Sequence, residues 1–297
     1  MASPTVRKVK LTEATMTGGL QEKKISSQHW PTYYWVSETQ SDITLVFLPG
    51  LTADHTLFES QISCFQDDFR IIVWDCPGHG KSRPYDEFTY ENVTTELHSI
   101  LTAENVDTAV FIGQSLGGMI AQFYIDRYPE KAAGFVSVDS VPFGDYYSRS
   151  DMFWLSQLER MCRMFPDKTL RSSMARMCGA TRSARNRMMQ ILSVYTKKEL
   201  CHLMYIGEAA FIPENKCIEL PCPGILLLGE KDRVGKVASY TKAWAKRTGY
   251  PIIKIPGAAH NSNDDRPELV NQIISDFLVK IYESTQMKIT ANNETTT

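Results

Sequence analysis

Short apolar runs alternate with amphipathic stretches along most of this chain. The runs rich in β-branched and aromatic residues are typical of buried strands and cover residues 43–48, 69–74, 109–112, 133–138, 224–228 and 251–255. The spacing of apolar positions between them predicts helices over about 56–65, 89–104, 119–128, 237–246 and 267–282. Residues 24–36 are expected to add antiparallel strands at a sheet edge. This alternation indicates an α/β protein with a mostly parallel central sheet flanked by helices.

Residues 141–220 interrupt the alternation. They have no strand pattern, their apolar residues recur at helical spacing, and eight of the twelve methionines lie among them. We interpret this segment as an all-helical cap inserted into a core of residues 21–140 and 221–283. Its methionines suit either an irregular pocket for an apolar ligand or the cap's own core. Residues 1–20 are expected to form a flexible arm, and the low-complexity residues 284–297 a disordered tail.

Composition and charge narrow the class of protein. The 297 residues are 43% hydrophobic and 22% charged, as in a soluble globular protein, and the net charge of −2 gives no reason to expect nucleic acid or an anionic membrane. No apolar run is long enough to span a bilayer, and no secretory signal is apparent. Seven irregularly spaced cysteines favour reduced thiols in a cytoplasmic protein. No zinc spacing or phosphate-binding loop occurs, so neither a metal nor an organic cofactor is expected.

The strongest chemical motif lies where the strand over 109–112 gives way to a helix. It reads Gly113-x-Ser115-x-Gly117, the pattern of a nucleophile elbow. A serine in so sharp a turn has a strained backbone, and the flanking glycines leave room for it. The turn directs the N–H of Leu116 and the start of a helix toward the hydroxyl, which favours a developing oxyanion.

A serine hydroxyl needs a base to become a good nucleophile, and the base needs an orienting carboxylate. Two residues that follow strands further along the chain fit these roles, Asp232 after residues 224–228 and His260 after residues 251–255. Asp139 also ends a strand and is an alternative carboxylate. Asp264 and Asp265 are expected to cap the helix that starts near Pro267.

With these motifs in order, the chain resembles the α/β-hydrolase superfamily over nearly its whole length. The segments that carry the resemblance are Leu48–Leu51, Asp75–Ser82, Gly113–Gly118, Gly229–Asp232 and Gly257–His260. Among its members, the chain looks most similar to small capped hydrolases of the esterase, lactonase and carbon–carbon hydrolase type. It departs from many of them in having Pro49-Gly50 rather than His-Gly, and Gln114 rather than histidine before the serine.

The resemblance implies an α/β-hydrolase fold and a role for each motif residue. Ser115 would be the nucleophile, His260 the general base and then acid, and Asp232 the orienting carboxylate. The backbone N–H groups of Leu51 and Leu116 would form the oxyanion hole.

Other residues near these motifs carry weaker expectations. Asn261 could hold the histidine loop through a side-chain hydrogen bond, whereas His79 is expected to be structural and His55 to lie on the surface. The cap arginines suit either an acidic substrate group or a solvated helix face. The residues that could line the pocket are Met119, Trp154 and His202.

These observations predict a serine hydrolase that cleaves an ester, lactone or related carbonyl bond of a small, largely apolar molecule through an acyl-enzyme. Three alternatives stay open. One is carbon–carbon bond hydrolysis on the same triad, the second is a cofactor-free lyase or perhydrolase, and the third is a small-molecule receptor that retains the fold. A small-molecule substrate is the expected partner, and the sequence leaves the oligomeric state open.

Overall fold

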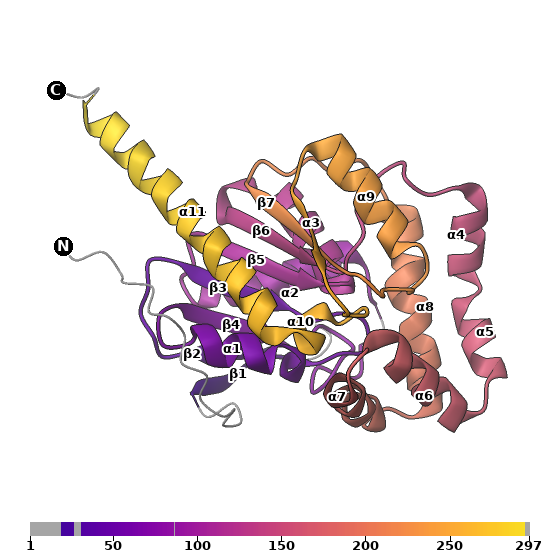
Figure 1. Ribbon diagram of the computed structural model, residues 1–297. Coiled ribbons are helices and arrows are strands. Elements are labelled where there is room, and N and C mark those ends of the chain that lie inside the picture. The colour runs from indigo at the N-terminus through magenta and orange to yellow at the C-terminus, as the bar shows by residue number, and fades with distance from the viewer. Residues whose placement is uncertain (1–18, 27–30, 86, 295–297) are drawn as a thin grey trace.

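An eight-stranded sheet forms the centre of the computed structural model, which describes residues 19–26, 31–85 and 87–294 (Figure 1). The strand order is β1-β2-β4-β3-β5-β6-β7-β8. The pairs β1–β2 and β2–β4 are antiparallel, and all the others are parallel. This topology confirms the predicted fold class. The strands are β1 (Leu20–Ser26), β2 (Pro31–Ser37), β3 (Thr44–Leu48), β4 (Arg70–Trp74), β5 (Ala109–Gln114), β6 (Ala132–Val138), β7 (Gly224–Gly229) and β8 (Ile252–Ile255).

Helices bury both faces of this sheet, which explains why its central strands are apolar at nearly every position. Along β3, Val46 and Leu48 face one hydrophobic core while Leu45 and Phe47 face the other. Helices α2 (Tyr90–Ala103), α3 (Leu116–Arg127) and α9 (Val237–Thr248) supply the first core. Helices α1 (Glu59–Phe65) and α11 (Pro267–Glu294) supply the second.

Five helices follow β6 before the chain returns to the sheet at β7. They are α4 (Arg149–Ser156), α5 (Leu158–Met164), α6 (Asp167–Cys178), α7 (Arg182–Ser193) and α8 (Lys197–Glu214), and we call them the helical insertion. Side-chain caps define several of their starts: Ser148 and Thr196 form capping boxes, and Thr181 accepts the backbone N–H of Ala184. Figure 1 shows the insertion gathered at one end of the sheet.

Several predicted boundaries differ from the structure. Helix α3 begins at Leu116, directly after the elbow serine, because the glycines after it adopt helical backbone. The helix predicted over 56–65 is divided into a 3-10 turn, η1 (His55–Phe58), and α1. A short helix, α10 (Ser262–Asp265), and the 3-10 turn η2 (Pro129–Lys131) were not predicted.

The chain ends also differ from expectation. The tail expected to be disordered over 284–297 is helical as far as Glu294, because α11 continues through it. Of the expected flexible arm, residues 1–18 lie outside the described residues, and Leu20 belongs to β1. Within the predicted edge strands, residues 27–30 also lie outside the described residues. All seven cysteines are free thiols. None of the helices in the described part of the chain is long and apolar enough to cross a membrane.

Two glycines allow β5, the elbow and α3 to pack against the neighbouring strand. A Cβ placed on Gly117 would lie 1.8 Å from the carbonyl oxygen of Leu48, and one on Gly113 would lie 2.5 Å from the Gly117 backbone. Both obstacles are main-chain atoms, which cannot move aside as a side chain could. The spacing of glycines around the serine is therefore a packing requirement of the fold.

Replacing Gly117 by alanine tests this requirement. We expect Gly117→Ala to lower the free energy of unfolding by more than about 3 kcal/mol, because the methyl group must displace strand backbone. Gly249→Ala is the matched control: Gly249 has a φ of 77° but nothing within 4 Å of an added Cβ. It should lose only about 1 kcal/mol from left-handed backbone strain. Urea unfolding of both variants makes the comparison, and equal losses would contradict the packing argument.

Candidate active site

Ser115 occupies a sharp turn between β5 and α3. Its backbone has φ 50° and ψ −119°, a conformation that is strained for a residue with a side chain. Two hydrogen bonds hold it there: the Ser115 N–H donates to the carbonyl of Val138 at 2.9 Å, and the Ser140 hydroxyl donates to the Ser115 carbonyl at 2.6 Å. The Ser115 side chain is half-buried, at the carboxyl ends of the parallel strands, where ligands bind in such sheets.

The structure brings Ser115, His260 and Asp232 together in one hydrogen-bonded chain. Ser115 Oγ lies 2.9 Å from His260 Nε2, and His260 Nδ1 lies 2.9 Å from Asp232 Oδ2. An ionised carboxylate only accepts hydrogen bonds, so Nδ1 carries the proton and the Nε2 lone pair faces the serine hydroxyl. Both His260 and Asp232 are buried. Residues 28 positions apart thus meet because β7 and β8 are adjacent parallel strands.

Asp139, the alternative carboxylate, serves a different set of contacts. Its side chain is fully buried, its φ is 48°, and its two oxygens accept the N–H of Gly229 at 2.6 Å and of Ser262 at 2.9 Å. Gly229 precedes the Asp232 loop and Ser262 follows His260. Asp139 therefore ties the two loops together through backbone donors, while the carboxylate in contact with the imidazole is that of Asp232.

Gln114 connects the elbow to the histidine loop. Its Nε2 donates to the carbonyl of His260 at 2.9 Å and to Asn261 Oδ1 at 3.2 Å. A Cβ on Gly50 would lie 2.0 Å from Gln114 Oε1 and 3.0 Å from the Cβ of Ser115, so a larger residue at position 50 would displace this amide. The sequence predicts no contact of this kind for Gln114. No local pattern could have indicated it, because its partners lie 146 and 147 residues away.

The helical insertion is anchored to the same loop by acidic side chains. Asp265 accepts the backbone N–H groups of Ala180, Thr181 and Ala259, and the Asn261 N–H donates to the carbonyl of Cys178 at 2.7 Å.

Arg187 of α7 makes the corresponding ionic contact, pairing with Asp264 at 3.1 Å and with Glu59 at 2.6 Å. Asp264 and Asp265 were expected to cap the last helix. The structure corrects this expectation: both side chains face the insertion, because α10 turns them away from the start of α11.

The two residues predicted to form the oxyanion hole belong to different segments, the turn after β3 and the start of α3. Leu116 is the first residue of α3, so its N–H is one of the donors that a helix leaves without an internal partner. Leu51 follows Gly50 in the turn after β3. Helix α8 covers both of their side chains, since a Cβ on Gly207 would lie 2.8 Å from Leu51 Cδ1 and 3.8 Å from Leu116 Cδ2.

The residues predicted to line the pocket divide into two groups. Met119 is buried on α3, where its sulfur accepts the hydroxyl of Tyr90 at 3.6 Å. Trp154 is 58% exposed on α4, and His202 is exposed on α8. Both exposed side chains lie on the helical insertion, and their place in the pocket stays a prediction.

Burial shifts the pKa values of Asp139 and of His79, in the loop after β4, in opposite directions. Desolvation raises the pKa of Asp139 to about 7, although the nearby His260 and the two backbone donors oppose this rise. Desolvation lowers the pKa of His79 to about 4. His79 Nδ1 donates to the carbonyl of Pro77 at 3.1 Å, while Nε2 has no partner in the described part of the structure. A second ring proton would thus be buried without an acceptor.

Comparison with known proteins places these features in a family. The family model described as "alpha/beta hydrolase fold" matches residues 43–267. Among curated proteins, the pimeloyl-[acyl-carrier protein] methyl ester esterase of Wigglesworthia glossinidia brevipalpis is 29% identical over 37% of this chain and 41% of its own length. The 3-oxoadipate enol-lactonase 1 of Acinetobacter baylyi is 32% identical over 32% of this chain and 34% of its own. The matches thus span well under half of these two relatives.

Solved structures match over more of the chain. A thermophilic esterase from Thermogutta terrifontis superposes with a TM-score of 0.71 at 20% identity, covering 88% of this chain and 99% of the esterase. At this identity the likeness concerns the fold.

The shifted pKa of His79 predicts a pH dependence of stability. The pKa of His79 in the folded protein lies below the ordinary value of 6.5. The contribution of neutral His79 to the free energy of unfolding is therefore complete above pH 6.5 and is lost as the pH falls toward 4. Between about pH 7 and pH 5, we expect the free energy of unfolding to fall by about 2 kcal/mol more in the wild type than in His79→Gln. Asp139 has the opposite sign, but it is present in both proteins and cancels in the difference.

Urea unfolding at the two pH values measures this difference. His202→Gln, at an exposed position, is the matched control and should follow the wild type. Parallel pH dependences for wild type and His79→Gln would refute the assignment.

Proposed function

Because the chain belongs to the alpha/beta-hydrolase family, we propose that it is a serine hydrolase that cleaves a carboxylic ester through an acyl-enzyme. The observation that carries the proposal is the hydrogen-bonded chain from Ser115 through His260 to Asp232, with 2.9 Å at each step. A base in contact with a serine hydroxyl, itself oriented by a buried carboxylate, is the arrangement that acyl transfer requires.

In the first half of the reaction, Ser115 Oγ attacks the ester carbonyl carbon as its proton passes to His260 Nε2. Asp232 stabilises the imidazolium that forms and stays ionised. The tetrahedral intermediate then collapses: the bond to the alkoxy oxygen breaks, and the proton on Nε2 passes to that oxygen. The products of this half are an alcohol and an ester of Ser115.

In the second half, water replaces the alcohol. His260 takes a proton from the water, whose oxygen attacks the acyl carbon, and then returns it to Ser115 Oγ as the acyl bond breaks. The carboxylic acid leaves, and the serine is restored.

The N–H groups of Leu51 and Leu116 would stabilise the oxyanion in both halves. Leu116 follows the serine directly, and Leu51 follows Gly50, which adjoins the Ser115 side chain. The positive end of α3 supports the same charge.

The surroundings of the serine favour a small, apolar acyl group. Leu51 and Leu116 lie beneath Gly207 of α8, and Tyr90 and Met119 pack beside them. Relatives named as an esterase and an enol-lactonase support ester and lactone bonds as the reaction class.

Removal of the nucleophile is the primary test. Ser115→Ala should lower kcat for a short-chain nitrophenyl ester by a factor on the order of 10⁵ to 10⁶ without changing the unfolding midpoint. A fluorophosphonate should label wild-type Ser115, as mapped by mass spectrometry, and should abolish turnover. Retained turnover in Ser115→Ala would refute the mechanism. Labelling of Ser115 without ester turnover would direct attention to carbon–carbon hydrolysis or to a receptor.

A second prediction separates the two aspartates. Asp232→Asn should lower kcat by about 10⁴, because an amide no longer fixes the imidazole tautomer. Asp139→Asn should lower kcat by about tenfold or less but reduce the unfolding temperature, since an amide can accept from only one of the two N–H groups it faces. Steady-state kinetics and thermal unfolding of both variants distinguish the two roles. The reverse order of kcat losses would identify Asp139 as the orienting carboxylate.

A further inference from the structure

The charge of this protein is unevenly distributed. Between Arg149 and Ser193, which spans α4 to α7, nine lysines and arginines stand against three acidic residues, a formal charge of +6 in a chain whose net charge is −2. Each of the three acidic side chains is paired with a basic one: Asp151 with Lys236, Glu159 with Arg163, and Asp167 with Arg171. Exposed basic side chains of this segment that appear in no ion pair of the described residues are Arg149, Arg160, Lys168, Arg176, Arg182 and Arg185.

Exposed apolar side chains are concentrated in the same segment. Of the eleven large hydrophobic side chains that the described part of the chain exposes, seven lie between Arg149 and Ser193. Five of them belong to α4, α5 and the residue that follows, which together form one edge of the insertion in Figure 1. We call residues 149–168 the α4–α5 edge; its exposed apolar side chains are Phe153, Trp154, Met161, Met164 and Phe165.

The α4–α5 edge is weakly packed onto the rest of the molecule. Helix α4 buries none of its side chains fully, and α5 buries only Cys162. Trp154 is 58% exposed and Met164 is 80% exposed. Bulky apolar groups presented to water on two successive helices indicate a surface that another phase or molecule covers.

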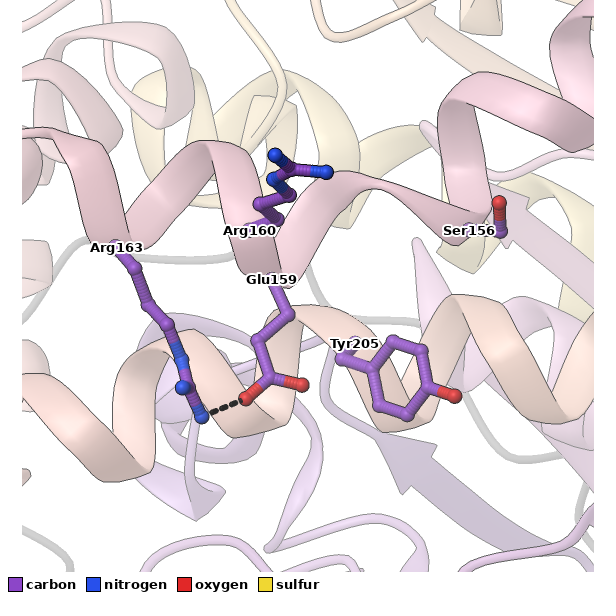
Figure 2. A pocket seen from close by; sticks show the side chains of 5 residues that line it. All are labelled: Ser156, Glu159, Arg160, Arg163 and Tyr205. Atoms are coloured by element: carbon purple, nitrogen blue, oxygen red, sulfur yellow. Dashed lines mark hydrogen bonds and ion pairs between the residues drawn. The ribbon is translucent and has the colours of Figure 1, made fainter.

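The hollow on this edge is polar. A shallow pocket of about 310 Å³ lies between α5 and α8 and is lined by Ser156, Glu159, Arg160, Arg163 and Tyr205 (Figure 2). In Figure 2, Arg163 reaches Glu159, whereas Arg160 extends away from both Glu159 and Tyr205. The guanidinium group of Arg163 is neutralised by the Glu159 carboxylate, whereas Arg160 and the two hydroxyls remain for an anionic headgroup rather than for an apolar side chain of a protein.

We infer that the α4–α5 edge docks on an anionic lipid surface. Tryptophan and phenylalanine side chains would enter the boundary between headgroups and acyl chains, and the arginines would contact the phosphates. The α4–α5 edge itself carries four basic and three acidic residues, and the arginines of α6 and α7 supply the rest of the positive charge of the segment. A segment of this charge is complementary to an anionic surface. A bilayer accepts apolar side chains in any arrangement, so the scattered apolar side chains of the edge fit this occupant.

Vesicle flotation with the full-length protein tests the inference. The vesicles contain phosphatidylcholine alone, or phosphatidylcholine with about 30% phosphatidylglycerol, at low and at high salt. Wild-type protein should float with the anionic vesicles at low salt only, because salt screens the charge interaction. Phe153→Ser/Trp154→Ser and Arg149→Glu/Arg160→Glu should each lower the partition coefficient by about tenfold or more.

The matched controls are exposed residues outside the basic segment of residues 149–193. Leu269→Ser replaces an exposed apolar residue of α11, and Lys246→Glu/Lys254→Glu reverses two exposed charges on α9 and β8. Both should float as the wild type does. Equal losses in the controls and in the edge variants would overturn the inference.

Tryptophan fluorescence supplies a second readout. Wild-type emission should shift to shorter wavelength on anionic vesicles, and Trp154→Phe should float normally but lose the shift. The variant assigns the shift to Trp154: Trp35, Trp74 and Trp244 are buried, and Trp30, which lies outside the described residues, is present in both proteins.

Two other outcomes would overturn the inference. If an acidic protein is the natural partner, the chain should stay at the bottom of the gradient with both kinds of vesicle. If a second copy of the chain covers the edge, sedimentation velocity should show a dimer that Phe153→Ser/Trp154→Ser dissociates, again without flotation. None of these measurements depends on ester turnover, so they stand apart from the proposed function.

Discussion

The close approach of α3 to the end of β3 is the constraint on which the site depends. A Cβ on residue 117 would lie only 1.8 Å from the Leu48 carbonyl oxygen. The helix can therefore start immediately after Ser115 only if residue 117 is glycine. The serine then has to adopt a φ of 50°, and hydrogen bonds to Val138 and Ser140 hold it there. The same geometry exposes the hydroxyl and directs the start of α3 toward it. Packing, backbone strain and the position of the nucleophile are thus one feature.

Buried carboxylates organise the rest of the site by accepting backbone hydrogen bonds. Asp139 joins the loop after β7 to the loop after β8, and Asp265 joins the second loop to the insertion. Each carboxylate receives two or more N–H donors, which compensate part of the cost of its burial. The position of His260 therefore depends on side chains that bind the backbone of the loops around it. A substitution at such a residue would act on the reaction through geometry rather than chemistry.

The features that the sequence predicted correctly depend on residues that are close together along the chain. The buried strands and the helices between them followed from periodicity, and the resemblance that led to the family depended on short contiguous motifs such as Gly113–Gly118. Contacts of long sequence separation could not be predicted in this way. Gln114 and Asp265 carry no motif, and their partners are fixed only once the sheet and the insertion are assembled. The length of α11 was missed for a different reason, because a polar, low-complexity sequence can still continue a helix that a core has started.

The net charge of the whole chain hides an uneven distribution of charge between the helical insertion and the rest of the molecule. The net charge of −2 argued against an anionic surface, but it is the difference between a basic segment over α4 to α7 and an acidic remainder. Electrostatic attraction depends on the charges within about a Debye length of the surface, so the segment that faces a partner matters and the total does not. The anchored side of the insertion, at Asp265 and Arg187, adjoins the histidine loop, whereas its exposed apolar groups gather on the α4–α5 edge. A binding event at that edge would therefore act on the part of the insertion that is least tied to the site.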